Sequence, residues 1–206
     1  MGYPRNDYLY KVTESETAQL KSKYGIAKNK KVVLYAPTFR DNKYSATAGF
    51  QLENHMDFAQ AKEALGDDYV ILFRAHYFIS GKLDLSAYEG FVIDVSKVED
   101  INELYVISDI LVTDYSSVFF DYANLRRPII FFMNDYEEYK NQTRDFYLDV
   151  AELPGKVTKK QEEVFAAIKE CEKGFVLDEK YKAFCEKFNY LDSAKTSSRV
   201  LEKILS

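Results

Sequence analysis

The chain has 206 residues, a length that fits one domain and is enough to bury a sizeable hydrophobic core. Hydrophobic residues make up 47% of it and charged residues 30%, as in an ordinary globular protein, and the net charge is −5 at pH 7. An acidic chain argues against nucleic acid as the main partner, because nucleic-acid phosphates require a basic surface. A small phosphorylated ligand needs only local positive potential and stays open.

A regular alternation of helices and strands is predicted from residue 13 to residue 132. The predicted strands are short apolar runs at 30–37, 69–76, 90–96, 109–114 and 128–132. The predicted helices between them lie at 13–25, 54–66, 96–108 and 116–125. A polar loop is expected from the first strand to about Phe50.

Capping signals place two of the helix starts. Thr13 and Glu16 have the spacing of a capping box, and Gly25 suits the end of that helix. Ser96 and Glu99 have the same spacing, so we expect a helix to begin at Ser96. Beyond the last strand we expect a long connection at 133–155 without clear periodicity. Three helical segments are predicted after it, at 160–173, 178–189 and 194–205.

Strands that are apolar on both faces and separated by helices indicate a parallel sheet covered on both sides. With right-handed crossovers this gives an α/β, Rossmann-like doubly wound domain, in which ligands bind at the carboxyl ends of the strands. Polar residues follow four of the predicted strands, at 38–40, 74–76, 94–96 and 114–117. We expect the functional site at this edge of the sheet.

The polar elbow at 114–117 joins a strand to a helix. Ser116 and Ser117 stand where the helix begins, and the free N–H groups and positive dipole end of a helix bind anions. The simpler alternative is that Ser116 only caps the helix. Asp114 is expected to orient the turn by accepting backbone N–H bonds, or to bind a ligand hydroxyl.

His76 and Arg40 also follow strands. The imidazole of His76 could donate to a phosphate oxygen or move a proton, or it could be a structural histidine. The guanidinium of Arg40 could bind phosphate or pair with Asp41. The pair Arg126-Arg127 is expected at the opposite end of the sheet as solvated surface.

Other site classes have little support in the sequence. Cys171 and Cys185 lack metal-ligand spacing and fit a reducing cytosol. Neither GxGxxG nor a P-loop is present, so no cofactor is evident and no metal ligand is assigned; the need for a divalent metal stays open. No apolar run approaches the ~20 residues of a membrane span.

Several motifs occur in a specific order: "GYPRND", "VLYAPTFRD", "FRAHYF", "DVSKVEDINELYVISDILVTDYSSVFFDYANLRRPIIFF" and "DSAKTSSRV". In this order they resemble the C-terminal domain of the CDP-glycerol glycerophosphotransferase family, the teichoic acid primases and polymerases of Gram-positive bacteria. The resemblance implies that residues 1–206 are one donor-binding domain, the C-terminal half of a GT-B fold. Residues 1–12 would be the interdomain segment and 190–206 the C-terminal helix. The acceptor half, with a histidine proposed as catalytic base, would precede "GYPRND".

The resemblance also assigns roles. The Arg-x-His-Pro motif of the family matches Arg74 to His76, with Tyr77 in place of proline, and its Asp-Tyr-Ser-Ser motif matches Asp114 to Ser117. Its Ala-Pro-Thr-x-Arg motif matches 36–40. The implied catalytic residue is His76, and the implied substrate-binding residues are Arg40, Arg74, Ser96, Asp114, Ser116 and Ser117. The late motif of the family is weakened here, as Asp192, Ser193, Ser197 and Arg199.

The expected function is donor binding in a glycerophosphotransferase. Such an enzyme moves glycerol phosphate from CDP-glycerol to a growing teichoic acid or related cell-wall or capsular polymer and releases CMP. We expect no turnover from this domain alone, and a full-length protein that is cytoplasmic and peripheral at the inner face of the cell membrane. The alternatives are a CDP-ribitol enzyme, a non-catalytic nucleotide-binding module, or another GT-B enzyme that uses a nucleotide sugar.

Overall fold

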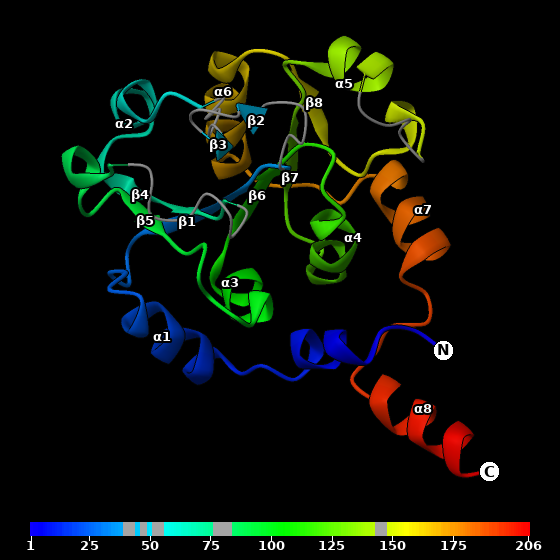
Figure 1. Ribbon diagram of the computed structural model, residues 1–206. Coiled ribbons are helices and arrows are strands. Elements are labelled where there is room, and N and C mark those ends of the chain that lie inside the picture. Colours follow the sequence, from blue (N-terminus) through cyan, green and yellow to red (C-terminus); the bar gives the residue numbers. More distant parts are fainter. Residues whose placement is uncertain (39–43, 46–48, 51–55, 76–83, 143–147) are drawn as a thin grey trace.

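The computed structural model describes residues 1–38, 44–45, 49–50, 56–75, 84–142 and 148–206. At its centre is a six-stranded sheet in which every neighbouring pair of strands is parallel (Figure 1). The strands are β1 (Lys31–Ala36), β4 (Tyr69–Phe73), β5 (Val92–Asp94), β6 (Ile110–Thr113), β7 (Ile129–Phe132) and β8 (Lys156–Thr158). Their order, β5-β4-β1-β6-β7-β8, reverses direction between β1 and β6, as in a doubly wound domain. The predicted fold class is confirmed.

The sixth strand, β8, is absent from the sequence prediction. It is three residues long and has one apolar side chain, Val157, so it lacks the apolar run that identifies the other strands. Gly155 lets it approach β7, because a Cβ at this position would lie 2.1 Å from the carbonyl oxygen of Ile129. This close approach of the two chain segments allows β8 to pair with β7 at the edge of the sheet.

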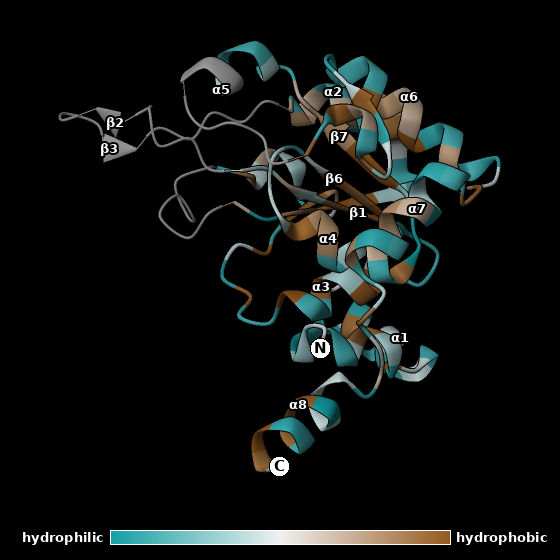
Figure 2. Cartoon of the chain, turned by 90° about the vertical axis from the view of Figure 1, so that its right-hand side faces the viewer, coloured by the Kyte–Doolittle hydropathy of each residue, from teal (hydrophilic) through white to brown (hydrophobic). Residues whose placement is uncertain are grey.

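Two hydrophobic cores form because strand side chains alternate between faces. In β1, Val32 and Leu34 point to one core, whereas Val33 and Tyr35 point to the other. The first core is covered by α3 (Ile101–Ile107), α4 (Val118–Tyr122) and α7 (Glu179–Phe188). The second is covered by α2 (Phe58–Leu65) and α6 (Gln161–Glu172). Figure 2 shows the apolar strands enclosed between these two helical layers.

The helix starts follow their capping residues. As predicted, α1 (Glu14–Lys23) begins after a capping box between Thr13 and Glu16. The predicted start at Ser96 is wrong: α3 begins five residues later and its N-cap is Asp100, which accepts from the N–H of Asn102. The Ser96 hydroxyl instead accepts a hydrogen bond from a neighbouring loop, described below. Capping-box spacing alone therefore did not locate this helix.

Two segments expected as loops contain regular structure. A small antiparallel hairpin pairs β2 (Tyr44–Ser45) with β3 (Gly49–Phe50) after β1. The long connection after β7 contains α5 (Tyr136–Gln142) and a 3₁₀ turn, η5 (Val150–Glu152). These pieces are too short for a periodicity to show in the sequence.

The two ends of the chain meet on the side of the first core. The 3₁₀ segment η1 (Pro4–Tyr10) packs against α3 and against the start of α8 (Thr196–Leu205), which then projects from the body of the domain (Figure 1). Leu201, Ile204 and Leu205 of α8 are exposed. In the described part of the chain, no helix combines the length and apolarity that a membrane crossing requires.

Candidate functional site

The candidate site lies where the strand order reverses, at the carboxyl ends of β1 and β6. Ala36 and Thr113 are paired at the last position of these two strands, and the Thr113 hydroxyl donates to the Ala36 carbonyl at 2.7 Å. The chain leaves both strands at this point, so residues 37–38 and 114–117 emerge side by side. Doubly wound domains bind their ligands in this crevice.

Asp114 fixes the geometry of the elbow. Its Oδ1 accepts hydrogen bonds from the backbone N–H of Thr38 at 2.8 Å, from the Thr38 hydroxyl at 2.5 Å, and from the N–H of Tyr115 at 2.6 Å. The side chain is buried. This confirms the prediction that Asp114 orients the turn by accepting backbone N–H bonds. It also joins the residues that follow β1 to those that follow β6.

Tyr115 attaches the elbow to the segment after β7. Its ring stacks on that of Tyr139, with centroids 3.7 Å apart and planes within 7°. Its hydroxyl donates to Asp135 at 3.0 Å. Tyr115 is itself buried, so it anchors the elbow in the protein.

Ser116 is half-buried and Ser117 is exposed. The N-cap residue of α4 is Ser117, and its side chain makes no capping hydrogen bond. The alternative in which Ser116 merely caps the helix is therefore wrong. Neither hydroxyl is committed to the helix end, and both stay available to a ligand.

Arg74 and Ser96 connect the ends of β4 and β5. Arg74 Nη1 donates to the carbonyls of Val95 at 3.1 Å and Val98 at 2.8 Å, and burial lowers the pKa of its guanidinium. Ser96 Oγ accepts from the N–H of Ala75 at 2.9 Å. Both side chains thus hold the loop after β5 in place. Direct contact of either with substrate stays a prediction.

Arg40 and His76, the other two predicted site residues, lie outside the described residues, as do His55 and Tyr77. Arg126 and Arg127 were both predicted as solvated surface. This is confirmed for Arg126, which is exposed, and wrong for Arg127. Arg127 Nη1 donates to the carbonyls of Tyr105, Val106 and Ser108 and so caps the end of α3.

The late motif does not join the site at the sheet edge. Asp192 accepts hydrogen bonds from the Tyr3 N–H and from the side-chain amides of Asn6 and Asn124. It thereby fastens the N-terminal segment to the end of α4. The sequence prediction did not find this connection, because its members are up to 189 residues apart.

A second group fastens the same segment to α4 and α8. Arg5 and Asn6 both donate to the Asp121 carboxylate. Asp7 accepts from the N–H groups of Thr196 and Ser197, the first residues of α8. Burial opposes ionisation of Asp7, but hydrogen bonds from Ser197 and Thr196 outweigh it and lower its pKa.

Metal binding has no visible basis in the part of the chain that the structure describes. Within those residues, no group of three or more histidine, cysteine, aspartate or glutamate side chains could hold a metal ion. Cys171 and Cys185 are both free and half-buried.

Comparisons with a family model, with curated proteins and with solved structures give consistent results. The model of the family described as "CDP-Glycerol:Poly(glycerophosphate) glycerophosphotransferase" matches residues 1–206. A teichoic acid poly(glycerol phosphate) polymerase of Bacillus subtilis (strain 168) is 43% identical over 206 residues, which are 98% of this chain and 28% of the relative. A teichoic acid poly(ribitol-phosphate) polymerase of Bacillus spizizenii is 36% identical over 211 residues, which cover 99% of this chain and 33% of that protein.

A solved structure of the wall teichoic acid polymerase TagF superposes with a TM-score of 0.85 at 39% identity. The match covers 99% of this chain and 50% of the TagF chain. The chain therefore spans half or less of the length of these proteins. The superposition supports the predicted assignment of the fold to the C-terminal half of a GT-B enzyme.

Proposed function

The chain belongs to the CDP-glycerol:poly(glycerophosphate) glycerophosphotransferase family, and we propose that it binds the CDP-glycerol donor of a glycerol phosphate transfer reaction. The acceptor of that reaction is a growing teichoic acid or related polymer. The observation that carries the proposal is the elbow between β6 and α4, where Ser116 and Ser117 stand at a helix start with hydroxyls free of capping bonds.

The elbow suits a diphosphate. Free N–H groups and the positive end of a helix attract anions, and serine hydroxyls donate without the bulk that would hold a phosphate away. Asp114 carries a negative charge nearby, but its Oδ1 faces Thr38 and Tyr115. Its role in the proposal is to hold the elbow in shape.

The proposed reaction is phosphoryl transfer. A hydroxyl of the acceptor attacks the β-phosphorus of CDP-glycerol, a new P–O bond forms, and the bond to the bridging oxygen breaks, so that CMP leaves with that oxygen. The attacking hydroxyl loses its proton to a base, for which the family resemblance implies a histidine of the acceptor half. Such reactions depend mainly on positioning and on stabilising charge.

The other predicted residues have proposed parts in this chemistry. The Ser116–Ser117 helix start and His76 would hold the diphosphate and stabilise the charge on departing CMP, and Arg40 would assist. Arg74 and Ser96 would act on the loop at 95–100, which we propose lies against the cytidine. The hydrogen bonds from Arg74 to this loop support a positioning role.

CDP-ribitol is the second candidate donor. The two donors differ only beyond the diphosphate, so the elbow by itself does not discriminate between them. The higher identity to the glycerol phosphate polymerase, 43% against 36%, favours glycerol. We propose that transfer requires an acceptor half like that of the longer relatives, in a protein that works at the inner face of the cell membrane.

A calorimetric titration with CDP-glycerol, CDP-ribitol, CMP and a UDP-sugar tests the proposal. We expect binding of CDP-glycerol with an affinity above that of CDP-ribitol, weaker binding of CMP, and no binding of the UDP-sugar. Preference for the UDP-sugar would identify a nucleotide-sugar enzyme and contradict the proposal.

A further inference from the structure

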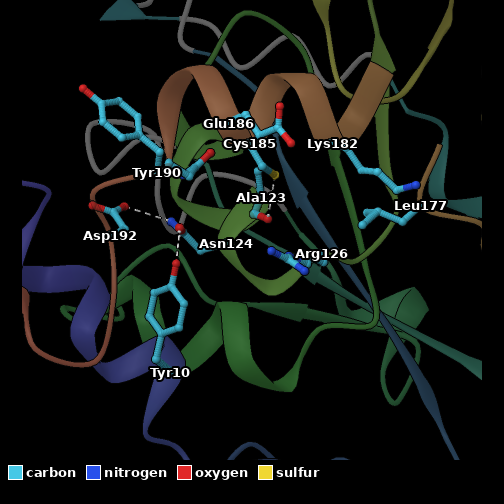
Figure 3. A pocket seen from close by; sticks show the side chains of 11 residues that line it. Tyr10, Ala123, Asn124, Arg126, Leu177, Lys182, Cys185, Glu186, Tyr190 and Asp192 are labelled. Carbon is cyan, nitrogen blue, oxygen red and sulfur yellow. Dashed lines mark hydrogen bonds between the residues drawn. The ribbon is translucent and has the colours of Figure 1, made fainter. Parts of the chain in front are cut away.

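A cavity of about 480 Å³ lies away from the elbow, between α7 and the turn at the end of α4, η4 (Ala123–Leu125) (Figure 3). Its size is that of a small-molecule site. It is lined by Tyr10, Ala123, Asn124, Arg126, Leu177, Lys182, Cys185, Glu186, Asn189, Tyr190 and Asp192. Nothing in the proposed donor chemistry uses these side chains.

Arg126 brings a positive charge to this cavity. Its side chain has no hydrogen bond or ion pair within the described part of the protein. Its backbone is left-handed, with φ of 52°, a conformation that costs free energy for a residue other than glycine. Figure 3 shows the guanidinium in the space between α7 and Tyr10. Lys182 of α7 adds a second positive charge at the wall; it is ion-paired with Glu179 at 2.6 Å, an exposed surface pair weak enough for a phosphate to displace.

The opposite wall is polar and preorganised. The hydroxyl of Tyr10 donates to Asn124 at 2.7 Å, and the amide of Asn124 donates to Asp192 at 3.2 Å. Asn189, which is buried, donates to the Phe120 carbonyl and so ties the end of α7 to α4. Its Oδ1 is shielded from solvent, so the acceptors open to a ligand are the carboxylates of the cavity.

Two carboxylates also line the cavity, and they restrict which ligands can bind there. Asp192 already accepts three hydrogen bonds, which disperse its charge. Glu186 is exposed on α7 and could accept from a ligand hydroxyl. The cavity thus combines cations for an anionic group with acceptors for hydroxyl groups.

We propose that this cavity binds a phosphorylated polyol, with Arg126 and Lys182 on the phosphate and Glu186 on the hydroxyls. If the proposed function holds, on which this assignment of the ligand rests, the occupant is a repeating unit of the polymer. Residues 118–125 run from the elbow to the cavity, so the two lie roughly 12 Å apart along the helix axis. The cavity would then hold the polymer away from the donor.

Binding of a glycerol phosphate trimer to substituted chains tests this. We expect Arg126→Gly to weaken binding of the trimer about tenfold or more, as for loss of a charged hydrogen bond. Binding of CDP-glycerol should stay unchanged. Glycine also relieves the left-handed backbone, so the variant should fold. Lys182→Ala should weaken binding of the trimer. Lys180→Ala, a substitution on the same helix but outside the cavity, should leave that binding unchanged.

The two free cysteines provide an independent readout. Cys185 lines the cavity and Cys171 does not, although both are half-buried. Saturating trimer should slow alkylation of Cys185 by iodoacetamide severalfold and leave Cys171 unchanged, and Arg126→Gly should abolish this protection. CDP-glycerol should protect neither cysteine.

The following results would overturn the proposal: an unaltered rate at Cys185, equal protection in Arg126→Gly, or inorganic phosphate binding as tightly as the trimer. Failure of the chain to bind CDP-glycerol would instead reject the donor proposal. The trimer experiments would still decide the ligand of the cavity.

Discussion

The carboxylate of Asp114 accepts two hydrogen bonds from Thr38, one from its backbone N–H at 2.8 Å and one from its hydroxyl at 2.5 Å. Seventy-six residues separate the two in sequence. The contact joins the chain after β1 to the chain after β6, at the point where the strand order reverses. It therefore fixes the crevice in which we place the donor diphosphate.

Asp114→Ala should lower both stability and donor affinity. The substitution removes the acceptor for two backbone N–H groups and one hydroxyl, which we expect to cost about 2–3 kcal/mol in the free energy of unfolding. Urea unfolding measures this, with Asp149→Ala as the control, since Asp149 is an exposed carboxylate that accepts one backbone N–H bond. Equal stability of the two variants would show that the contact with Thr38 is unimportant.

Arg74→Gln should loosen the loop after β5. The two carbonyls that Arg74 holds, those of Val95 and Val98, would lose a charged donor. We expect faster amide hydrogen exchange in residues 95–100 and severalfold weaker binding of CMP, because this loop is the proposed cytidine contact. Normal exchange together with weaker binding would indicate direct contact of Arg74 with the ligand.

The sequence was most informative where elements are long or apolar. It predicted five of the six strands, because each lies in a short apolar run of the sequence, and it located α1 through Thr13 and Glu16. It missed β8, whose outer residues Lys156 and Thr158 are polar, and the closeness of Gly155 to Ile129, which depends on tertiary structure.

The site shows the same division. The elbow was predictable because Asp114 to Ser117 interrupt two apolar runs. The hydrogen bonds that Arg74 and Ser96 make were not predictable, since they join residues about 21 positions apart, at the ends of two neighbouring strands. The network around Asp192 combines residues from both ends of the chain, and no local pattern signals it.

Gly155→Ala should destabilise the edge of the sheet. A methyl group would clash with the Ile129 carbonyl at 2.1 Å, so β7 and β8 would have to separate. We expect a loss of at least about 2 kcal/mol, in the range of overpacked sites. Gly90→Ala is a useful comparison, because a Cβ there meets no atom within 4 Å, although its positive φ of 76° adds strain. A smaller effect at Gly155 than at Gly90 would contradict the close approach.

Asp7 should make the attachment of α8 depend on pH. Its pKa lies below the ordinary value of 3.8, so its ionised form stabilises the folded state above that pH. The stabilisation should disappear as the pH falls through the lowered value. Unfolding of the wild type and of Asp7→Asn, followed from pH 6 downwards, should show a stability difference that is constant above about pH 5 and shrinks in acid. A difference that does not change with pH would exclude the charge as its cause.

The central claim is that the hydroxyls at the start of α4 hold the donor diphosphate. Calorimetric titration of CDP-glycerol into Ser117→Ala tests it most directly, with Ser22→Ala, an exposed serine of α1, as the matched control. We predict affinity about tenfold to a hundredfold weaker for Ser117→Ala, unchanged affinity for Ser22→Ala, and unchanged melting temperatures for both. Affinity of Ser117→Ala equal to that of the wild type would contradict the account.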